Sequence, residues 1–151
     1  MAKKSRPAGK IVNRRARFDY ELGDTLVVGL QLTGAETKAL RLGHGVLRGA
    51  YVTIKDNELW LINAQIMGGR GIQILDDAQT RSRKLLAKRQ EIDRLIEAKQ
   101  QGNTIVPLEL LTDSRYIKLR IAVGRGKKRY DKRETIKRRQ QERDIARQTK
   151  G

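Results

Sequence analysis

The sequence contains no cysteine, one histidine, two prolines and six aromatic residues among its 151 residues. The absence of cysteine excludes disulfide bonds, thiolate catalysis and cysteine-based zinc sites, and it fits a reducing cytoplasm. No apolar run approaches the ~18 residues that a membrane-spanning helix needs. His44 has no second histidine or cysteine with which to hold a metal ion. We therefore expect no metal, no cofactor and no membrane partner.

The titratable residues form no catalytic set. Asp76 and Asp77 are adjacent acids, but acids shortly before a cationic helix are more often caps and partners of the helix dipole. His44 follows Gly43 and is interpreted as a residue at the C-terminal end of a helix, where the dipole favours it. Without a nucleophile and a base that could act together, an enzyme is disfavoured.

The abundant residues are cationic. Lysine and arginine total 34 against 17 acids, which gives a net charge of +17 and a pI of about 10.7. Such an excess attracts polyanions over long distances, so nucleic acid is the predicted partner. The basic segments lack the aromatic or leucine-rich face of a helix that lies on a membrane. An aromatic content of 4% is low for base stacking and favours a folded RNA held through its phosphates and shape.

Short apolar segments predict a mainly β fold. Strands are expected at residues 26–32, 50–54, 58–66, 103–111 and 115–123. The turn residues Asp56-Asn57 and Thr112–Ser114 separate neighbouring segments, so both pairs of segments are predicted hairpins. Pro107 predicts an edge position or a bulge. The last strand alternates with a period of two, and its apolar face consists of Ile117, Leu119, Ile121 and Val123.

Two helices are predicted between the strands. Thr33 and Glu36 match a capping box and begin a helix that ends at Gly43. Residues 80–102 form the second, whose apolar stripe consists of Leu85, Leu86, Ile92, Leu95 and Ile96. Short strands with two helices and no βαβ alternation predict an α+β, mainly β fold. For a basic chain, the natural candidate is an OB-fold-type antiparallel barrel with flanking helices.

The chain divides into three zones. Residues 1–12 are expected to be a disordered basic arm, residues 13–123 an OB-fold RNA-binding domain, and residues 124–151 a basic C-terminal tail. From residue 131 to 150 the tail lacks glycine and proline and is rich in good helix formers. Because it is polar all round, we expect it to be disordered alone and helical once RNA phosphates neutralise it. The alternative is a solvated appendage without a role.

Six short motifs, in this order along the chain, resemble one family. They are Asn13–Arg17, Gly29–Gly34, Glu36–Arg41, Arg83–Leu86, Thr104–Pro107 and Gly126–Arg133. From about Asn13 to its last residues, the chain resembles the SsrA-binding proteins, also called small protein B. This family is the partner of tmRNA in trans-translation, the rescue of stalled bacterial ribosomes.

The resemblance implies an adaptor that binds the tRNA-like domain of tmRNA (SsrA RNA) and delivers it to stalled ribosomes. The protein would mimic the codon–anticodon stem at the decoding centre, and its tail would lie as a helix along the empty mRNA channel of the small subunit. Family residues that touch tmRNA correspond to Asn13 and Leu86. The family motif that the complex needs for productive passage into the ribosome corresponds to Asp131, Lys132 and Arg133. We expect a cytoplasmic monomer.

The candidate RNA-binding residues form two groups. On the barrel, Arg14, Arg15 and Lys84 suit phosphates, and the Asn13 amide can both donate to and accept from RNA edges. Leu86 is either an RNA contact or a core residue, and spacing does not decide between them. The ribosome-facing group on the tail consists of Lys127, Lys128, Arg129, Asp131, Lys132, Arg133, Lys137 and Arg138.

The chain departs from the family pattern at three places. Val27 stands where the family usually has an acid, which predicts an altered RNA contact. Met67–Gly71 replaces a usual Pro-Tyr, which predicts a different loop. Gln148-Thr149 replaces an Ile-Met pair of some members, which predicts weaker anchoring of the tail tip.

Two other functions are compatible with parts of the sequence. A structural protein that binds ribosomal RNA would suit the charge of +17 and the basic tail equally well. An RNA-processing enzyme is the third possibility, and the missing catalytic set disfavours it.

Overall fold

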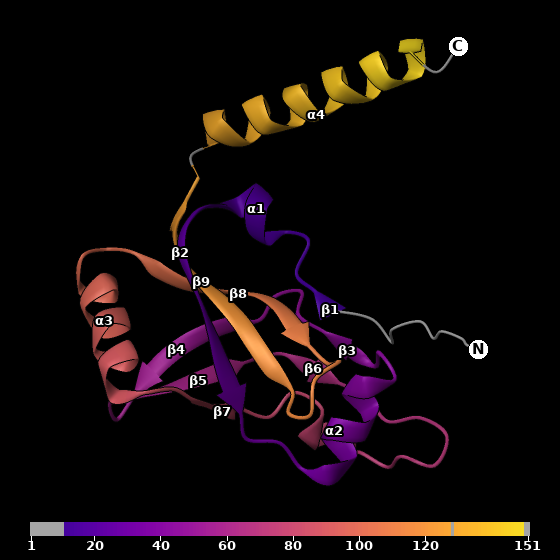
Figure 1. The fold of residues 1–151 in the computed structure, drawn as a ribbon, viewed down its shortest axis with the longest axis vertical. Coiled ribbons are helices and arrows are strands. Elements are labelled where there is room, and N and C mark those ends of the chain that lie inside the picture. The colour runs from indigo at the N-terminus through magenta and orange to yellow at the C-terminus, as the bar shows by residue number, and fades with distance from the viewer. Residues whose placement is uncertain (1–10, 128, 150–151) are drawn as a thin grey trace.

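The computed structural model describes residues 11–127 and 129–149 (Figure 1). Its strands are β1 (Ile11–Val12), β2 (Tyr20–Leu30), β3 (Gly45–Val46), β4 (Tyr51–Lys55), β5 (Glu58–Ile62), β6 (Gln65–Ile66), β7 (Arg83–Leu86), β8 (Thr104–Leu111) and β9 (Lys118–Gly126). Its helices are α1 (Ala16–Asp19), α2 (Gly34–Arg41), α3 (Arg89–Gln100), α4 (Arg129–Thr149) and the 3₁₀ turn η1 (Asp76–Ala78). Most of the predicted N-terminal arm lies outside the described residues. Its last two residues, expected to be disordered, form β1 instead, because they pair with β8.

The sheet is antiparallel and barrel-like. Seven strands follow one another in the order β1-β8-β9-β2-β7-β5-β4, and β3 pairs separately with β6. Every strand pair among the described residues is antiparallel. The sheet curls but does not close, because β1 and β4 at its two ends are not paired with each other. The predicted mainly β, antiparallel architecture is confirmed.

The core lies inside the curled sheet. Leu119 and Ile121 of β9 are fully buried there, and Ile117 just before β9 joins them, so the predicted alternation is confirmed. A smaller cluster consists of Ala16, Val106, Leu108 and Ala122. Ala122 has the outward parity of Lys118 and Arg120, so this cluster lies on the outer side of the sheet.

The two predicted hairpins and the bulge are confirmed. The β4–β5 turn is made by Asp56 and Asn57, whose φ angles of 54° and 60° fit the mirror-image turn that matches strand twist. Strands β8 and β9 pair over most of their length, with a register shift between Pro107 and Glu109. The extra residue, Leu108, packs against Ala16 of α1 in the small outer cluster.

The capping box of α2 is also confirmed. The Thr33 side chain accepts from the Glu36 amide at 3.1 Å, and Glu36 Oε1 accepts from the Thr33 amide at 2.9 Å. At the other end, the Arg41 guanidinium donates to the carbonyls of Thr112, Ser114 and Arg115. Arg41 therefore fastens the loop between β8 and β9 to the end of α2.

The predicted helix over residues 80–102 is wrong at its N-terminal half. Residues 83–86 form β7, which pairs with β5 and β2, and α3 begins only at Arg89. The Lys88 amide donates to Glu91, which caps this later start. Asp76 and Asp77, expected to cap the helix, lie in η1, where Asp76 Oδ1 accepts from Gln79. Leu85 and Leu86 satisfy helical spacing by chance, because a strand separates them onto opposite faces.

The tail has the helical conformation that was expected for its RNA-bound state. Residues Arg129–Thr149 form α4, which extends away from the barrel beyond the end of β9 (Figure 1). A long run of good helix formers explains this conformation. Disorder of the free tail in solution stays a prediction. In the described part of the chain, no helix has both the length and the apolar character needed to cross a membrane.

Candidate nucleic-acid interface

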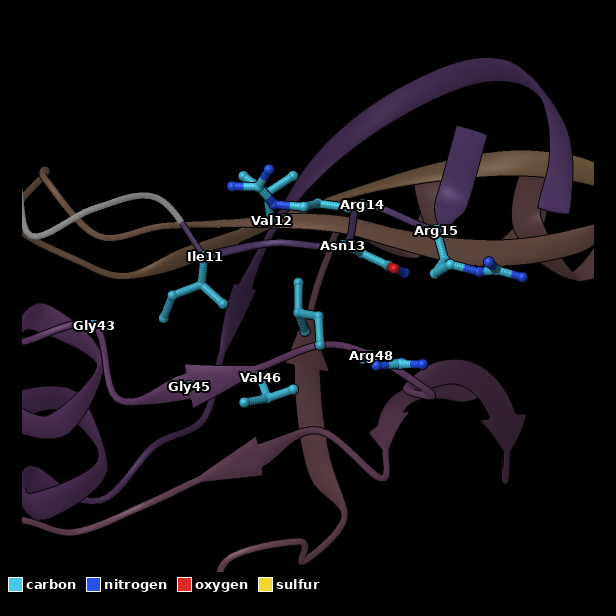
Figure 2. Close-up of a pocket in the computed structure, with 10 residues that line it drawn as sticks. Ile11, Val12, Asn13, Arg14, Arg15, Gly43, Gly45, Val46 and Arg48 are labelled. Carbon is cyan, nitrogen blue, oxygen red and sulfur yellow. The ribbon is translucent and has the colours of Figure 1, made fainter. Parts of the chain in front are cut away.

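A groove of about 480 Å³ lies between β1, one end of the curled sheet, and β3. We call this groove the barrel seam; its lining includes Val12, Arg14 and Arg15 from the β1 side and Val46 and Arg48 from the β3 side. Figure 2 shows the three arginines on the two facing segments. None of the described residues that line the seam is acidic, so its charge attracts anions.

Asn13 positions the basic residues beside it. Its backbone amide donates to Leu108 at 2.8 Å, and its side-chain Nδ2 donates to the Pro107 carbonyl at 2.9 Å. Both bonds end at the bulge of β8, so Asn13 anchors the chain there. The amide group that was predicted to contact RNA edges already uses its donor within the barrel.

Arg14 and Arg15 have different surroundings. The Arg15 guanidinium pairs with Asp19 at 3.3 Å and lies 4.5 Å from the centre of the Phe18 ring. Arg14 is exposed, and within residues 11–127 its side chain has no hydrogen bond or ion pair. Of the two, Arg14 is therefore the freer cation for a phosphate.

Lys84 and Leu86 lie elsewhere, on the outer face of the sheet. They alternate along β7 with the buried Arg83 and Leu85. Leu86 is 49% exposed and stands opposite Gly29 of β2, so it is a surface residue and not part of the core. Lys84 is half-buried opposite Trp60 of β5.

The outer face continues across neighbouring strands. Register places Lys118 opposite Gly29 and Arg120 opposite Val27. We call this surface the outer sheet face; it consists of Lys84, Leu86, Val27, Lys118 and Arg120. Arg120 donates to Glu109 at 2.7 Å, and Val27 is 39% exposed. From β1 to β7 the sheet takes four strand spacings, or about 19 Å. The structure therefore places Lys84 and Leu86 on the outer sheet face and Asn13 and Arg15 at the seam, while Arg14 borders both, because it also lines a hollow with Glu109 and Arg120.

A buried ion cluster holds β7 in place, and the sequence analysis found only one of its members. Glu36, 2% exposed, meets Arg83, 0% exposed, with 3.0 Å between Oε2 and the Arg83 guanidinium. Arg81 donates to both Glu36 oxygens, at 2.6 and 2.9 Å. Arg83 also donates to the carbonyls of Ala64, Ala78, Gln79 and Arg81. Nothing in the sequence pattern marks Arg83 as buried, because arginine is rarely found there.

The cluster shifts the pKa values of its members. Burial alone would raise the pKa of the Glu36 carboxyl, but hydrogen bonds from Arg81 and the Thr33 amide, with the charges of Arg83 and Arg81, hold that pKa below its usual value. Burial lowers the pKa of the Arg83 guanidinium, and Glu36 opposes that change. Arginine stays charged in proteins, so the cluster keeps Glu36 ionised at neutral pH. Its role is to fix the strand that presents Lys84 and Leu86.

The tail residues are placed only in part. The Lys127 amide donates to the Asp19 carbonyl at 2.9 Å, which ties the start of the tail to α1. Lys128 lies outside the described residues, and Arg129, Asp131 and Lys132 are placed by their backbone in α4. The exposed cations of α4 include Arg133, Lys137 and Arg138. Together they give the helix an exposed basic surface.

His44 is the remaining isolated titratable group. Its Nδ1 is buried without a hydrogen-bond partner within the described residues, and a Cβ on Gly69 would lie 2.8 Å from the ring. The imidazole thus packs beneath the glycine-rich loop. No group of three or more metal-ligating side chains occurs in the described ranges.

Comparisons with known proteins cover both the barrel and the tail. The family described as "SmpB protein" matches this chain over residues 10–151. The chain belongs to the SmpB family. It is 46% identical to an SsrA-binding protein of Trichormus variabilis over 91% of this chain and 90% of that protein. It is 45% identical to one of Paracoccus denitrificans over 92% of each.

A solved structure extends the SmpB likeness to three dimensions. It is described as "tmRNA-SmpB: a journey to the center of the bacterial ribosome" and matches with a TM-score of 0.66 and 35% sequence identity. The match covers 84% of this chain and 94% of that chain. The shared fold agrees with the mainly β barrel described above.

Proposed function

We propose that this protein is a non-enzymatic RNA-binding adaptor of trans-translation. The barrel binds the tRNA-like domain of tmRNA, and the complex enters cytoplasmic ribosomes that have stalled on a message without a stop codon. The family match across residues 10–151 carries this proposal. The net charge of +17 and the arginines around the barrel seam support it, because phosphates dominate the affinity of proteins for RNA.

The outer sheet face and the seam provide different contacts to RNA. The exposed Leu86 and its neighbour Lys84 offer an apolar contact beside a cation, an arrangement that suits the sugar and phosphate edges of folded RNA. Arg14 supplies charge at the seam. Asn13 acts by anchoring the segment that carries Arg14 and Arg15.

The tail acts at the ribosome. Its basic residues, among them Arg133, Lys137 and Arg138, are exposed on α4 and suit the RNA-walled mRNA channel. In this proposal the barrel mimics the codon–anticodon stem as a monomer. The helix then occupies the channel only when no message is present.

Two assays test this division. Full-length protein is titrated into the tRNA-like domain of tmRNA and into a ribosomal RNA fragment of equal length. We expect tighter binding to the tRNA-like RNA; equal affinity for both would instead support a structural ribosomal-RNA-binding protein. A reconstituted tagging assay on stalled ribosomes then measures the activity of the adaptor.

A further inference from the structure

We propose that the barrel seam binds an unpaired RNA segment, and that Arg48 and Val46 are contact residues of this site. The inference rests on the proposed function, since it names the part of the RNA that the adaptor would grip there. It assigns the turn after β3 as a second side of the RNA site, opposite the segment that carries Arg14 and Arg15.

The seam carries free charge on both walls. Arg48 is exposed, and like Arg14 it has no hydrogen bond or ion pair within residues 11–127. Arg15 is partly neutralised by Asp19. Arg14 also lines a neighbouring hollow that contains Glu109. Arg48 lines the seam, which contains no acid, and it suits phosphate oxygens, which arginine binds through paired N–H groups.

The β3 side of the seam is apolar and open at Val46, which is 37% exposed. Val12 stands opposite Glu109 of β8, so its side chain faces the outer side of the sheet. A volume of about 480 Å³ falls in the range of pockets that enclose a small ligand. An RNA duplex keeps its bases stacked and paired inside, whereas an unpaired segment can place a nucleotide in such a groove.

An aromatic side chain lies where the seam continues. A second hollow of about 390 Å³ shares Asn13 and Arg15 with the seam and is lined by Tyr51, whose side chain is 52% exposed. Tyr51 lies three residues after Arg48, at most about 10 Å along the chain. A cationic groove that leads to an aromatic ring is the arrangement with which proteins hold single-stranded RNA.

The groove is preformed by the packing of β3. A Cβ on Gly45 would lie 2.6 Å from Leu40 Cδ2 and 2.9 Å from Ile11 Cδ1, so a larger residue there would displace these two side-chain ends. The Ala50 amide donates to the Leu47 carbonyl at 2.9 Å, and Gly49 has a φ of +81°. This closes a turn with glycine at its third position. Arg48 is therefore presented from a fixed turn.

Photocrosslinking in the full-length protein tests the inference. Val46 is replaced by p-benzoylphenylalanine, and the protein is irradiated with the tRNA-like domain of tmRNA in one arm and with stalled ribosomes carrying the complex in the other. Reverse transcription maps the crosslinked nucleotides. We expect crosslinks to unpaired nucleotides in at least one arm, and the arms identify the RNA. Crosslinks only to paired stems, or none in either arm, would overturn the inference.

Matched variants separate a contact from a general loss of charge. R48A should weaken the crosslink and lower the affinity for the RNA identified by crosslinking about tenfold, with the salt slope reduced by about 0.7. R94A removes the same charge from the exposed face of α3 and should change affinity less than about twofold. V46W should block the groove, while L75W adds the same ring at another exposed position. Equal effects of R48A and R94A, with V46W no weaker in binding than L75W, would overturn the inference.

The same experiments distinguish two kinds of failure. Wild-type protein that does not bind the tRNA-like domain at all would contradict the proposed function. Wild-type protein that binds this RNA, without crosslinks from residue 46 and without a specific effect of R48A, contradicts only the inference about the seam.

Discussion

Glu36 and Arg83 form an ion pair in which neither side chain reaches solvent, with 3.0 Å between the carboxylate and the guanidinium. Glu36 comes from the first turn of α2 and Arg83 from β7, so the pair joins two elements that are distant in sequence. Further hydrogen bonds from Arg83 and Arg81 to Glu36 and nearby carbonyls surround it. This relationship fixes the strand on which the candidate contact residues Lys84 and Leu86 stand.

Replacing Glu36 should destabilise the fold strongly. In E36Q the buried Arg83 loses its counter-charge, and breaking a buried pair costs about 3–5 kcal/mol. Urea denaturation measures the free energy of unfolding. The control is E58Q, whose partner Arg89 lies 3.8 Å away at the surface and whose loss should cost less than about 1 kcal/mol. A similar cost for both variants would contradict the role given to the cluster.

The stability of the protein should fall in acid partly through Glu36. The folded state holds the pKa of this carboxyl below its ordinary value of 4.5, so the unfolded chain takes up the proton first as pH falls. The stabilisation of the fold by ionised Glu36 is fully present above pH 4.5, and it is lost as pH falls through the pKa of the folded state. Urea denaturation at about pH 7 and about pH 3 should show a larger loss for wild type than for E36Q. Equal losses would show that Glu36 does not carry the effect.

Two adjacent leucines should behave in opposite ways. L85A empties a fully buried site and should cost about 2–5 kcal/mol of unfolding free energy. L86A changes a side chain that is 49% exposed and should cost less than about 1 kcal/mol, but it should weaken binding to the tRNA-like RNA. Thermal unfolding and an RNA gel shift measure the two properties. A large stability loss in L86A would mean that this residue packs in the core after all.

The tail should be needed at the stalled ribosome, in a step that follows binding of the tRNA-like RNA by the barrel. Replacing Asp131, Lys132 and Arg133 together by alanine leaves the barrel seam and the outer sheet face unchanged, so affinity for the tRNA-like RNA should stay within about twofold of wild type. Tagging on stalled ribosomes should be lost. If RNA binding disappears as well, the division of roles between barrel and tail is wrong.

Free tail peptide tests the conformational part of the proposal. Because its charges repel and it has no apolar face, residues 128–151 should give the circular dichroism of a coil in buffer and become helical when RNA is added. A stable helix in buffer would show that helix formation does not depend on RNA.

Local signals predicted those elements whose causes are local. The capping box of Thr33 and Glu36 and the turn at Asp56-Asn57 depend on neighbouring residues, and both are present. Pro107 marks the bulge because proline cannot donate to the ladder. The alternation of β9 succeeds because one face of that strand is buried.

Contacts between distant segments explain what the sequence missed. Residues 83–86 fit a helical stripe, but pairing with β5 and β2 makes them a strand. The burial of Arg83 depends on Glu36, 47 residues away, and on the Ala64 carbonyl, 19 residues away. Arg48 received no prediction because it faces the segment of Arg14 only across the groove between β1 and β3. Sequence motifs identified Asn13 as a contact, while its bond to Pro107 shows an anchoring role.

The central claim is that the barrel recognises a tRNA-like RNA and does not bind RNA by charge alone. The most direct measurement is the affinity of nucleic-acid-free, full-length protein for the tRNA-like domain of tmRNA over a series of salt concentrations, with a plain RNA duplex of equal length as competitor. We expect affinity to fall steeply with salt, and we expect the tRNA-like RNA to stay bound at salt concentrations that release the duplex. Equal binding of both RNAs at every salt concentration would contradict the claim.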